Sequence, residues 1–141
     1  TGLKWAAAAG GSGDFLADGT VPMTGELDLG ANSIGGTLKS VTPAGGPGNT
    51  DIDWTSGNFA AMTFGASNAF FAFTANPSNA GLLVLKLTQD ATGSRTVTWP
   101  AAVKWSGGTA PTLTTAANAV DVIRFFFDGT NYYGTFDLNF S

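Results

Sequence analysis

The sequence predicts an all-β fold, an antiparallel β-sandwich or jelly roll that is preceded by a short extended segment. Three observations support this prediction. Short strand-like segments follow one another with turn residues between them, as in antiparallel all-β domains. The segment from Leu82 to Gln89 alternates as a half-buried strand does. The stretch from Val120 to Phe140 predicts two aromatic strands that are joined by an Asp-Gly turn.

The first part of the chain, residues 1–49, is expected to be an extended segment that precedes the main β domain. Between Asp14 and Ile34, apolar residues recur among close turn signals such as Asp18-Gly19 and Thr24-Gly25. Pieces this short cannot bury themselves within one chain. We therefore expect them to wrap around copies of the same segment. Residues 35–49 are rich in Gly and Pro, which places the domain boundary there and makes residues 50–141 the head domain.

Strands of the head domain are expected at 51–55, 59–64, 69–74, 82–89 and 95–99, followed by the terminal hairpin. Within 82–89, one side of the strand carries Leu83, Leu85 and Leu87, and the other has a partly apolar character. Pro100 closes the next strand because it cannot donate to a ladder. The loop 106–118 has little to bury, so we expect it to lie over the surface.

The hairpin has the same two faces whether its two-residue turn is Asp128-Gly129 or Gly129-Thr130. One face is apolar and comprises Ile123, Phe125, Phe127, Tyr132, Phe136 and Leu138. The other is mixed and comprises Val122, Arg124, Phe126, Tyr133, Thr135 and Asp137. Phe125 is predicted to lie in the core opposite Gly134, where the missing side chain leaves room for its ring. Arg124 is expected to pair with Asp137 or with an Asp at a subunit contact.

The mixed face is the predicted oligomer interface, because a sandwich needs only one apolar face per sheet. Exposed apolar patches of this kind mark contacts between proteins. The chain also has few ionised groups with which to keep such a face in water, since only 11% of its residues are charged. The predicted interface residues are Val122, Arg124, Phe126, Tyr133 and Asp137.

Composition excludes several classes of function. The six cations are spread singly along a chain of net charge -4, which argues against a nucleic-acid partner. With no Cys and no His, disulfides, thiolate metal sites and Ser-His-Asp or Cys-His catalysis are ruled out. Apolar runs are too short for a transmembrane helix. Because the chain begins at Thr1 rather than Met, we expect a fragment or a processed product.

Two kinds of candidate site are weak. The carboxylate pairs Asp51/Asp53 and Glu26/Asp28 offer too few oxygens for a hard cation and no nucleophile-base pairing, so solvated or turn-capping aspartates are favoured. We expect no enzyme activity, no metal and no cofactor. Aromatic side chains could form a sugar-stacking platform, although aromatics at alternating strand positions are more often core. The candidates for such a platform are Trp54, Trp105 and Tyr133.

Residues 18–30, DGTVPMTGELDLG, resemble the D-G-x-x-P-M-T-G-x-L-D-[M/L] segment of bacteriophage tail-fibre and related virion-fibre proteins. Leu87 to Pro100, Lys104-Trp105 and Asp128 to Gly134 resemble the terminal domains of phage fibre proteins. The resemblance implies that residues 1–49 are a shaft or attachment segment and that residues 50–141 are a head domain. It also implies a virion location, a homotrimer, contacts of the N-terminal segment with other virion proteins, and attachment to a host glycan or protein. Fibres often carry several shaft repeats, and this chain has one, so a truncated fibre or a short spike or decoration protein is also expected to fit.

Two alternatives to a tail fibre stay open at this point. One is a capsid decoration or head-fibre protein, and the other is a non-catalytic carbohydrate-binding module without a virion context. An ordered threefold spike on particles would favour a fibre, whereas a monomer that binds soluble glycan would favour the binding module.

Overall fold

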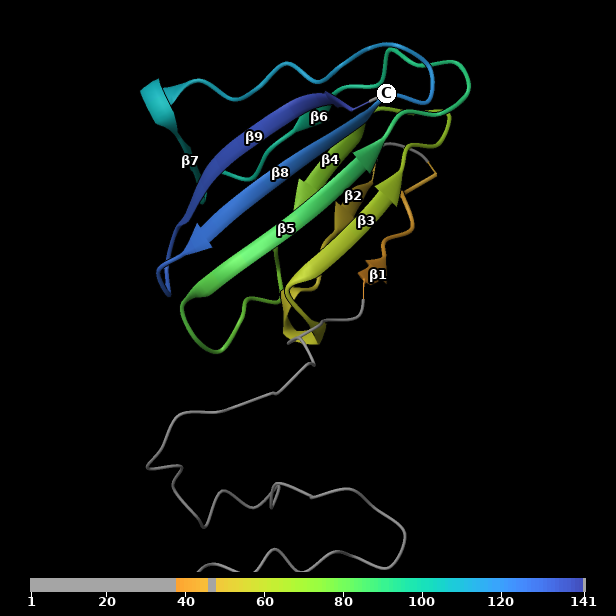
Figure 1. Ribbon diagram of the computed structural model, residues 1–141. Helices are drawn as coiled ribbons and strands as arrows, with labels where there is room; N and C mark the ends of the chain where they lie inside the picture. Colours follow the sequence, from red (N-terminus) through yellow and green to blue (C-terminus); the bar gives the residue numbers. More distant parts are fainter. Residues whose placement is uncertain (1–37, 46–47, 141) are drawn as a thin grey trace, which may run out of the picture. The chain divides into compact units, whose positions relative to one another are not determined.

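The computed structural model describes residues 38–45 and 48–140, whose strands lie in two sheets (Figure 1). All of them belong to the second of the two units, 1–34 and 35–141, into which contacts divide the chain. The first sheet contains, in spatial order, β1 (Leu38–Ser40), β3 (Phe59–Thr63), β5 (Gly81–Thr88), β8 (Val120–Phe127), β9 (Tyr132–Phe140) and β7 (Val103–Trp105). The second contains β2 (Asn49–Asp51), β4 (Ala69–Ala72) and β6 (Val97–Thr98).

The chain winds as a β-solenoid, because strands one to six alternate between the two sheets. We call each consecutive pair a rung: β1 with β2, β3 with β4, and β5 with β6. Successive rungs pair in parallel in both sheets. Leu38 pairs with Phe59 and Asn49 pairs with Phe70, so the first rung repeats after 21 residues on both sides. The strands β8 and β9 then close the winding as an antiparallel hairpin against β5.

The all-β prediction is confirmed, since no α-helix occurs among the described residues. The prediction of an antiparallel sandwich or jelly roll is wrong, because the three rungs pair in parallel and only β5, β8 and β9 run antiparallel. The physical reason is that a half-buried strand alternates with period two whichever way its neighbour runs. A solenoid supplies the crossover that a parallel pair needs by passing through the opposite sheet.

Several element boundaries differ from the prediction. The expected strand 51–55 ends at Asp51, and a 3-10 helix, η1 (Trp54–Ser56), follows it. Neither β1 nor β7 was predicted, and β1 lies before the expected domain boundary while pairing with β3 beyond it. After β7 comes a second 3-10 turn, η2 (Ser106–Gly108). The shaft motif and the pair Glu26/Asp28 lie outside the described residues.

The core lies between the two sheets and is filled by aliphatic and aromatic side chains. As predicted, Leu83, Leu85 and Leu87 point inward from β5 and are buried. Leu113 is also buried, so the loop 106–118 is anchored to the core and does not only cover the surface as expected. Asp121 helps to hold this loop, because its carboxylate accepts hydrogen bonds from the backbone N–H of Thr114 at 2.8 Å and from that of Asn139 at 2.9 Å.

Candidate functional site

The hairpin β8–β9 fixes which side chains face the core and which face outward. Its turn is Gly129-Thr130, one of the two predicted registers, and Gly129 has a φ of 103°. Asp128 accepts hydrogen bonds from the backbone N–H groups of Thr130 at 2.8 Å and Asn131 at 2.7 Å, which closes the turn. These backbone bonds hold the pKa of the Asp128 carboxyl below its usual value. The predicted division of the hairpin into two faces follows from this register.

The inward face confirms that Phe125 is a core residue, since its side chain is fully buried opposite Gly134. The ring that occupies the space over Gly134 is, however, that of Trp105 from the neighbouring strand β7. A Cβ atom at Gly134 would lie 2.7 Å from Cε3 of this indole. Trp105 also contacts Phe125, with ring centroids 6.1 Å apart. The missing side chain of Gly134 therefore makes room for Trp105 on the parallel neighbour β7. The prediction had assigned this space to Phe125 on the antiparallel neighbour β8.

The outward face of the hairpin is mixed, as predicted, and its charges pair within the chain. Arg124 forms an ion pair with Asp137, the first of the two predicted partners, and both side chains are half-exposed. Phe126 stacks on Tyr133 directly across the strands, with centroids 6.4 Å apart and rings inclined by 28°. Phe126 is 48% exposed and Tyr133 46%, so the stacked pair offers its other surfaces to a partner.

This face continues from the hairpin over β5, β3 and β1, which the sequence prediction missed in part. Leu82 lies beside Phe126 in the register, and it is 70% exposed. In the next row of paired residues across the sheet, Leu38 lies beside Phe59, and the row continues through Val84 to Arg124. We call the large exposed apolar residues of this face the outer apolar band: Leu38, Phe59, Leu82, Phe126 and Tyr133.

The predicted aromatic platform is not brought together. Trp54 is 2% exposed and packs edge-on against Phe73 and Phe125 in the core. Trp105 is partly buried over Gly134. Tyr133 alone of the three predicted residues lies on the outer face, where hydrogen bonding to the Asp128 carboxylate raises the pKa of its phenol. A flat sugar-stacking surface made from all three rings therefore does not exist in this structure.

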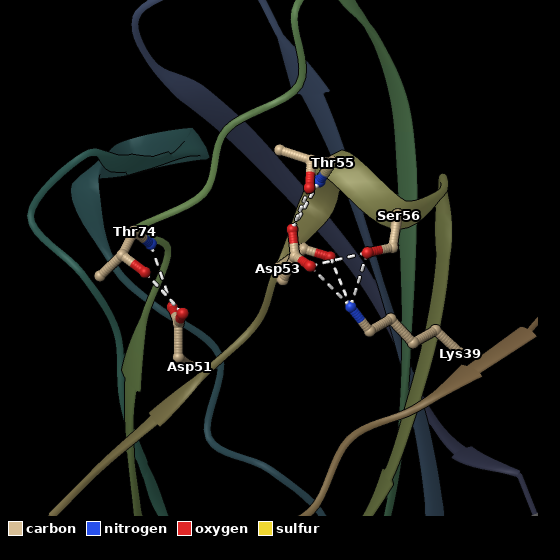
Figure 2. A network of polar contacts seen from close by, with 6 residues as sticks. All are labelled: Lys39, Asp51, Asp53, Thr55, Ser56 and Thr74. Carbon is tan, nitrogen blue, oxygen red and sulfur yellow. Dashed lines mark hydrogen bonds and ion pairs between the residues drawn. The ribbon is translucent and has the colours of Figure 1, made fainter.

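A polar cluster lies where β2 runs into η1, and Figure 2 shows its two parts. Asp53 caps η1 by accepting the N–H of Thr55 at 2.9 Å. Its other carboxylate oxygen binds Nζ of Lys39 at 2.9 Å and the hydroxyl of Ser56 at 2.6 Å. Asp51 is separately occupied, because it accepts the N–H of Thr74 at 3.0 Å. Asp53 therefore has the turn-capping role that the sequence favoured, whereas Asp51 ties β2 to the segment that follows β4.

The electrostatics of this cluster suit a structural tie more than acid-base chemistry. Hydrogen bonds from Ser56, Thr55 and Lys39 hold the pKa of the Asp53 carboxyl far below its ordinary value. A carboxylate that stays ionised in this way is a poor proton donor near neutral pH. Within residues 38–45 and 48–140, no group of three or more His, Cys, Asp or Glu side chains is arranged to hold a metal ion. Over the same residues, no helix is long and apolar enough to cross a membrane.

Comparison with known proteins gives one family. Residues 42–132 match the family model described as "Putative phage tail fibre C-terminal domain". Of the nine strands in the described residues, the matched range leaves out β1 and most of β9. A search of curated proteins and a search of solved structures each returned no match.

Proposed function

This chain belongs to the family of phage tail fibre C-terminal domains, and from that premise we propose that it is a homotrimeric fibre end that attaches the virion to its host. It is a structural component of the virion, and the family membership supports its association with other virion proteins. Within the proposal, the shaft or attachment segment lies in residues 1–49, and the face that meets other copies extends over the sheet from β1 to β9. Attachment to a host glycan or protein is part of the same proposal.

The observation that carries the oligomer proposal is the outer apolar band. The side chains that point inward from β5, β8 and β9 already fill the core, so the band is a second apolar surface on the same sheet. Its five residues lie on strands that are direct neighbours, which makes the surface continuous from β1 to β9. Apolar patches of this kind on one face mark protein contacts. The predicted interface residues Val122, Arg124 and Asp137 lie on the same outward face of the hairpin.

A second copy of the chain is the proposed occupant of this face, with threefold order taken from the resemblance to phage fibres. Residue pattern alone does not set the order of a symmetry axis. Arg124 and Asp137 neutralise each other on this face, and Lys86, which lies beside Val122, adds an exposed positive charge to it. A closed ring of three copies would also give the short apolar pieces between Asp14 and Ile34 the partners that they need.

Native mass spectrometry tests the assembly. We expect three chains and no folded monomer on dilution. Leu82→Ser should weaken assembly because it removes the most exposed apolar side chain of the band, and Arg124→Glu should weaken it by placing a second negative charge beside Asp137. Thr98→Glu is the matched control, because Thr98 is exposed on β6 in the other sheet. A stable folded monomer at micromolar concentration would overturn the interface, whereas a dimer would overturn the threefold order alone.

The place of the chain on the particle has its own test. Electron micrographs of particles labelled with an antibody against this chain should show the label at the far ends of tail fibres. Label over the capsid surface would replace the tail-fibre proposal with a decoration or head-fibre role. Purified chain should also compete with particles for adsorption to host cells, and absence of competition by a correctly assembled chain would refute the attachment role.

A further inference from the structure

The six-stranded sheet ends in two different edges, which Figure 1 shows at opposite sides. β1 forms one edge, and no described strand lies beyond it. β7 forms the other edge, but it pairs only with residues 132–134 of β9. Gly107 and Gly108 follow with φ values of 69° and 75°, and the chain leaves the sheet there. Among the described residues, β9 is therefore an open edge from Thr135 onward.

The backbone of Phe136 points towards this open edge. The N–H of Tyr132 donates to the carbonyl of Ala102, next to β7, at 3.0 Å. Because every second residue of a strand directs its N–H and C=O to the same side, those of Phe136 also point away from β8. Neither group has a backbone partner across this edge within the described residues. Phe136 thus offers one donor and one acceptor to a further strand.

The side chains on the inner face of this stretch are incompletely covered. Phe136 lies opposite Ile123 in the register, and both point inward. Ile123 is fully buried, whereas Phe136 is 42% exposed. Leu138 is only partly buried against the core. The inner layer therefore stops short of β9 just where its pairing with β7 ends.

The stretch also lacks the usual protection of an open edge. Proteins protect such edges with charges, proline or bulges. From Thr135 to Leu138 there is no proline, and the one charged residue, Asp137, forms an ion pair with Arg124. The register shift between β8 and β9 begins only after Asp137. A short run of residues thus remains open to a strand of similar length, and β1 has three residues.

The free side of β1 has the complementary backbone groups. The N–H of Val41 donates to the carbonyl of Ala61, beside β3, at 2.8 Å. By the same alternation, the backbone groups of Leu38 and Ser40 point away from β3. In a parallel pair, a residue bonds to the two residues that flank the one opposite it. If Phe136 lies opposite the middle residue of β1, it donates to the carbonyl of Leu38 and accepts from the N–H of Ser40.

Direction and facing agree with this parallel pair. β1, β3 and β5 are parallel, and two antiparallel steps through β8 lead to β9, so β1 and β9 run in the same direction. A rotation about an axis along the strands keeps that direction in the next copy. Leu38 and Thr135, which would lie side by side, are both exposed on the outer face of the sheet.

We propose that the open edge of β9 from Thr135 to Leu138 pairs in parallel with β1 of a second copy, and that this contact repeats around the ring. The inference rests on the proposed trimer and specifies the strands that form it. A ring of three copies needs a contact between unlike surfaces, because a contact between like surfaces closes as a dimer. The two edges of this sheet are unlike surfaces, and their pairing joins the outer apolar band of one copy to that of the next through Leu38.

Disulfide trapping tests the pairing directly, because the natural chain has no Cys. We expect the double variant Leu38→Cys and Thr135→Cys to give linked chains up to a trimer on denaturing gels without reductant, and single chains with it. β3, β5 and β8 separate the two positions within one chain. Four strand spacings of about 4.8 Å make about 19 Å, well beyond the reach of a disulfide. Any link therefore joins two copies.

Two controls define the contact. Leu38→Cys with Thr98→Cys should stay unlinked, because Thr98 is exposed on the second sheet. Thr135→Cys alone should also stay unlinked, and dimers from it would overturn the proposal by showing that like edges meet. If the natural chain is a trimer by native mass spectrometry and the double variant gives no link, the edge pairing is overturned and the trimer stands. A natural chain that is monomeric or dimeric overturns the ring and this pairing with it.

Ser40→Pro tests the hydrogen bonds of the edge. Proline removes an N–H that points away from β3, so the ladder within the chain is kept. The concentration at which trimers dissociate should rise about tenfold, as expected for one lost hydrogen bond at each contact. Ser40→Ala is the matched control, because it keeps the N–H and should dissociate like the natural chain. Equal dissociation of Ser40→Pro and Ser40→Ala would overturn the pairing.

Discussion

At the scale of single residues, Gly134 shows how closely the terminal hairpin and β7 are packed. The indole of Trp105 lies over its backbone, and any side chain at this position would enter the ring. Gly134→Ala should therefore reduce the free energy of unfolding by about 1 to 3 kcal/mol, the usual cost of overpacking. Urea unfolding measures this difference. Gly45→Ala is the matched control, because a Cβ atom at Gly45 would meet no atom within 4 Å.

Phe125 is the centre of the aromatic core, where its ring meets those of Trp54, Phe73, Trp99, Trp105 and Tyr132. Phe125→Ala should cost about 3 to 5 kcal/mol of unfolding free energy, as large-to-small changes of a buried aromatic do. Phe70→Ala offers a comparison, since Phe70 is 44% exposed on the outside of the second sheet. A urea-unfolding loss below about 1 kcal/mol for Phe125→Ala would contradict its place in the core.

Tyr132 gives stability an alkaline dependence on pH. Burial raises the pKa of its phenol from 10.0 to about 12. The folded chain then holds this proton more tightly than the unfolded chain, so its contribution is complete below about pH 10 and is lost as pH rises towards about 12. Urea unfolding of the natural chain and of Tyr132→Phe should show a gap in stability that narrows between about pH 10 and about pH 12. A gap that stays constant would contradict this coupling.

At the scale of elements, the Lys39–Asp53 contact joins β1 to the cap of η1. Because hydrogen bonds lower the pKa of the Asp53 carboxyl, its stabilising effect is present above the unfolded pKa and is lost as pH falls through the folded one. Asp53→Asn should therefore lower the thermal midpoint at neutral pH. The difference from the natural chain should shrink once pH falls below about 4. An unchanged difference at low pH would show that the carboxylate charge does not matter.

Elements with local signals were predicted well from the sequence, and elements that depend on distant partners were not. The hairpin follows from Asp128-Gly129 and from the parity of its strands, and β5 follows from its alternating leucines. Parallel winding leaves no such local sign. Successive rungs are offset by 21 residues in one case and by 25 between Phe59 and Val84, so the repeat is irregular in the sequence. Very short strands such as β1 carry too few residues for a periodic pattern.

The candidate site was predicted in the same uneven way. The pairing of Arg124 with Asp137 and the outward direction of Phe126 and Tyr133 follow from hairpin parity alone. Leu38 and Phe59 join the outer apolar band only through the parallel ladder, which the sequence pattern does not reveal. Trp54 lies in the core because η1 turns the chain inward just after β2, where the sequence predicted a continuing strand.

At the scale of the whole molecule, we expect no hydrolase activity. The chain has no His and no Cys, and the described carboxylates Asp51 and Asp53 are occupied by hydrogen bonds from their neighbours. Purified protein should release no reducing ends from host surface polysaccharide, as measured by a reducing-sugar assay over several hours. Release that Asp53→Asn abolishes would contradict this expectation and would identify a catalytic carboxylate.

The parallel ladder also bears on how fibre ends of this kind can differ in length. Each rung contacts mainly the rung before it and the rung after it, as in other solenoids, where stability grows with each repeat. Duplicating or deleting a stretch of about 21 residues, the offset between the first two rungs, would keep every remaining strand in register. Gene segments could therefore be exchanged at rung borders while the terminal hairpin, which closes only the last rung, stays the same.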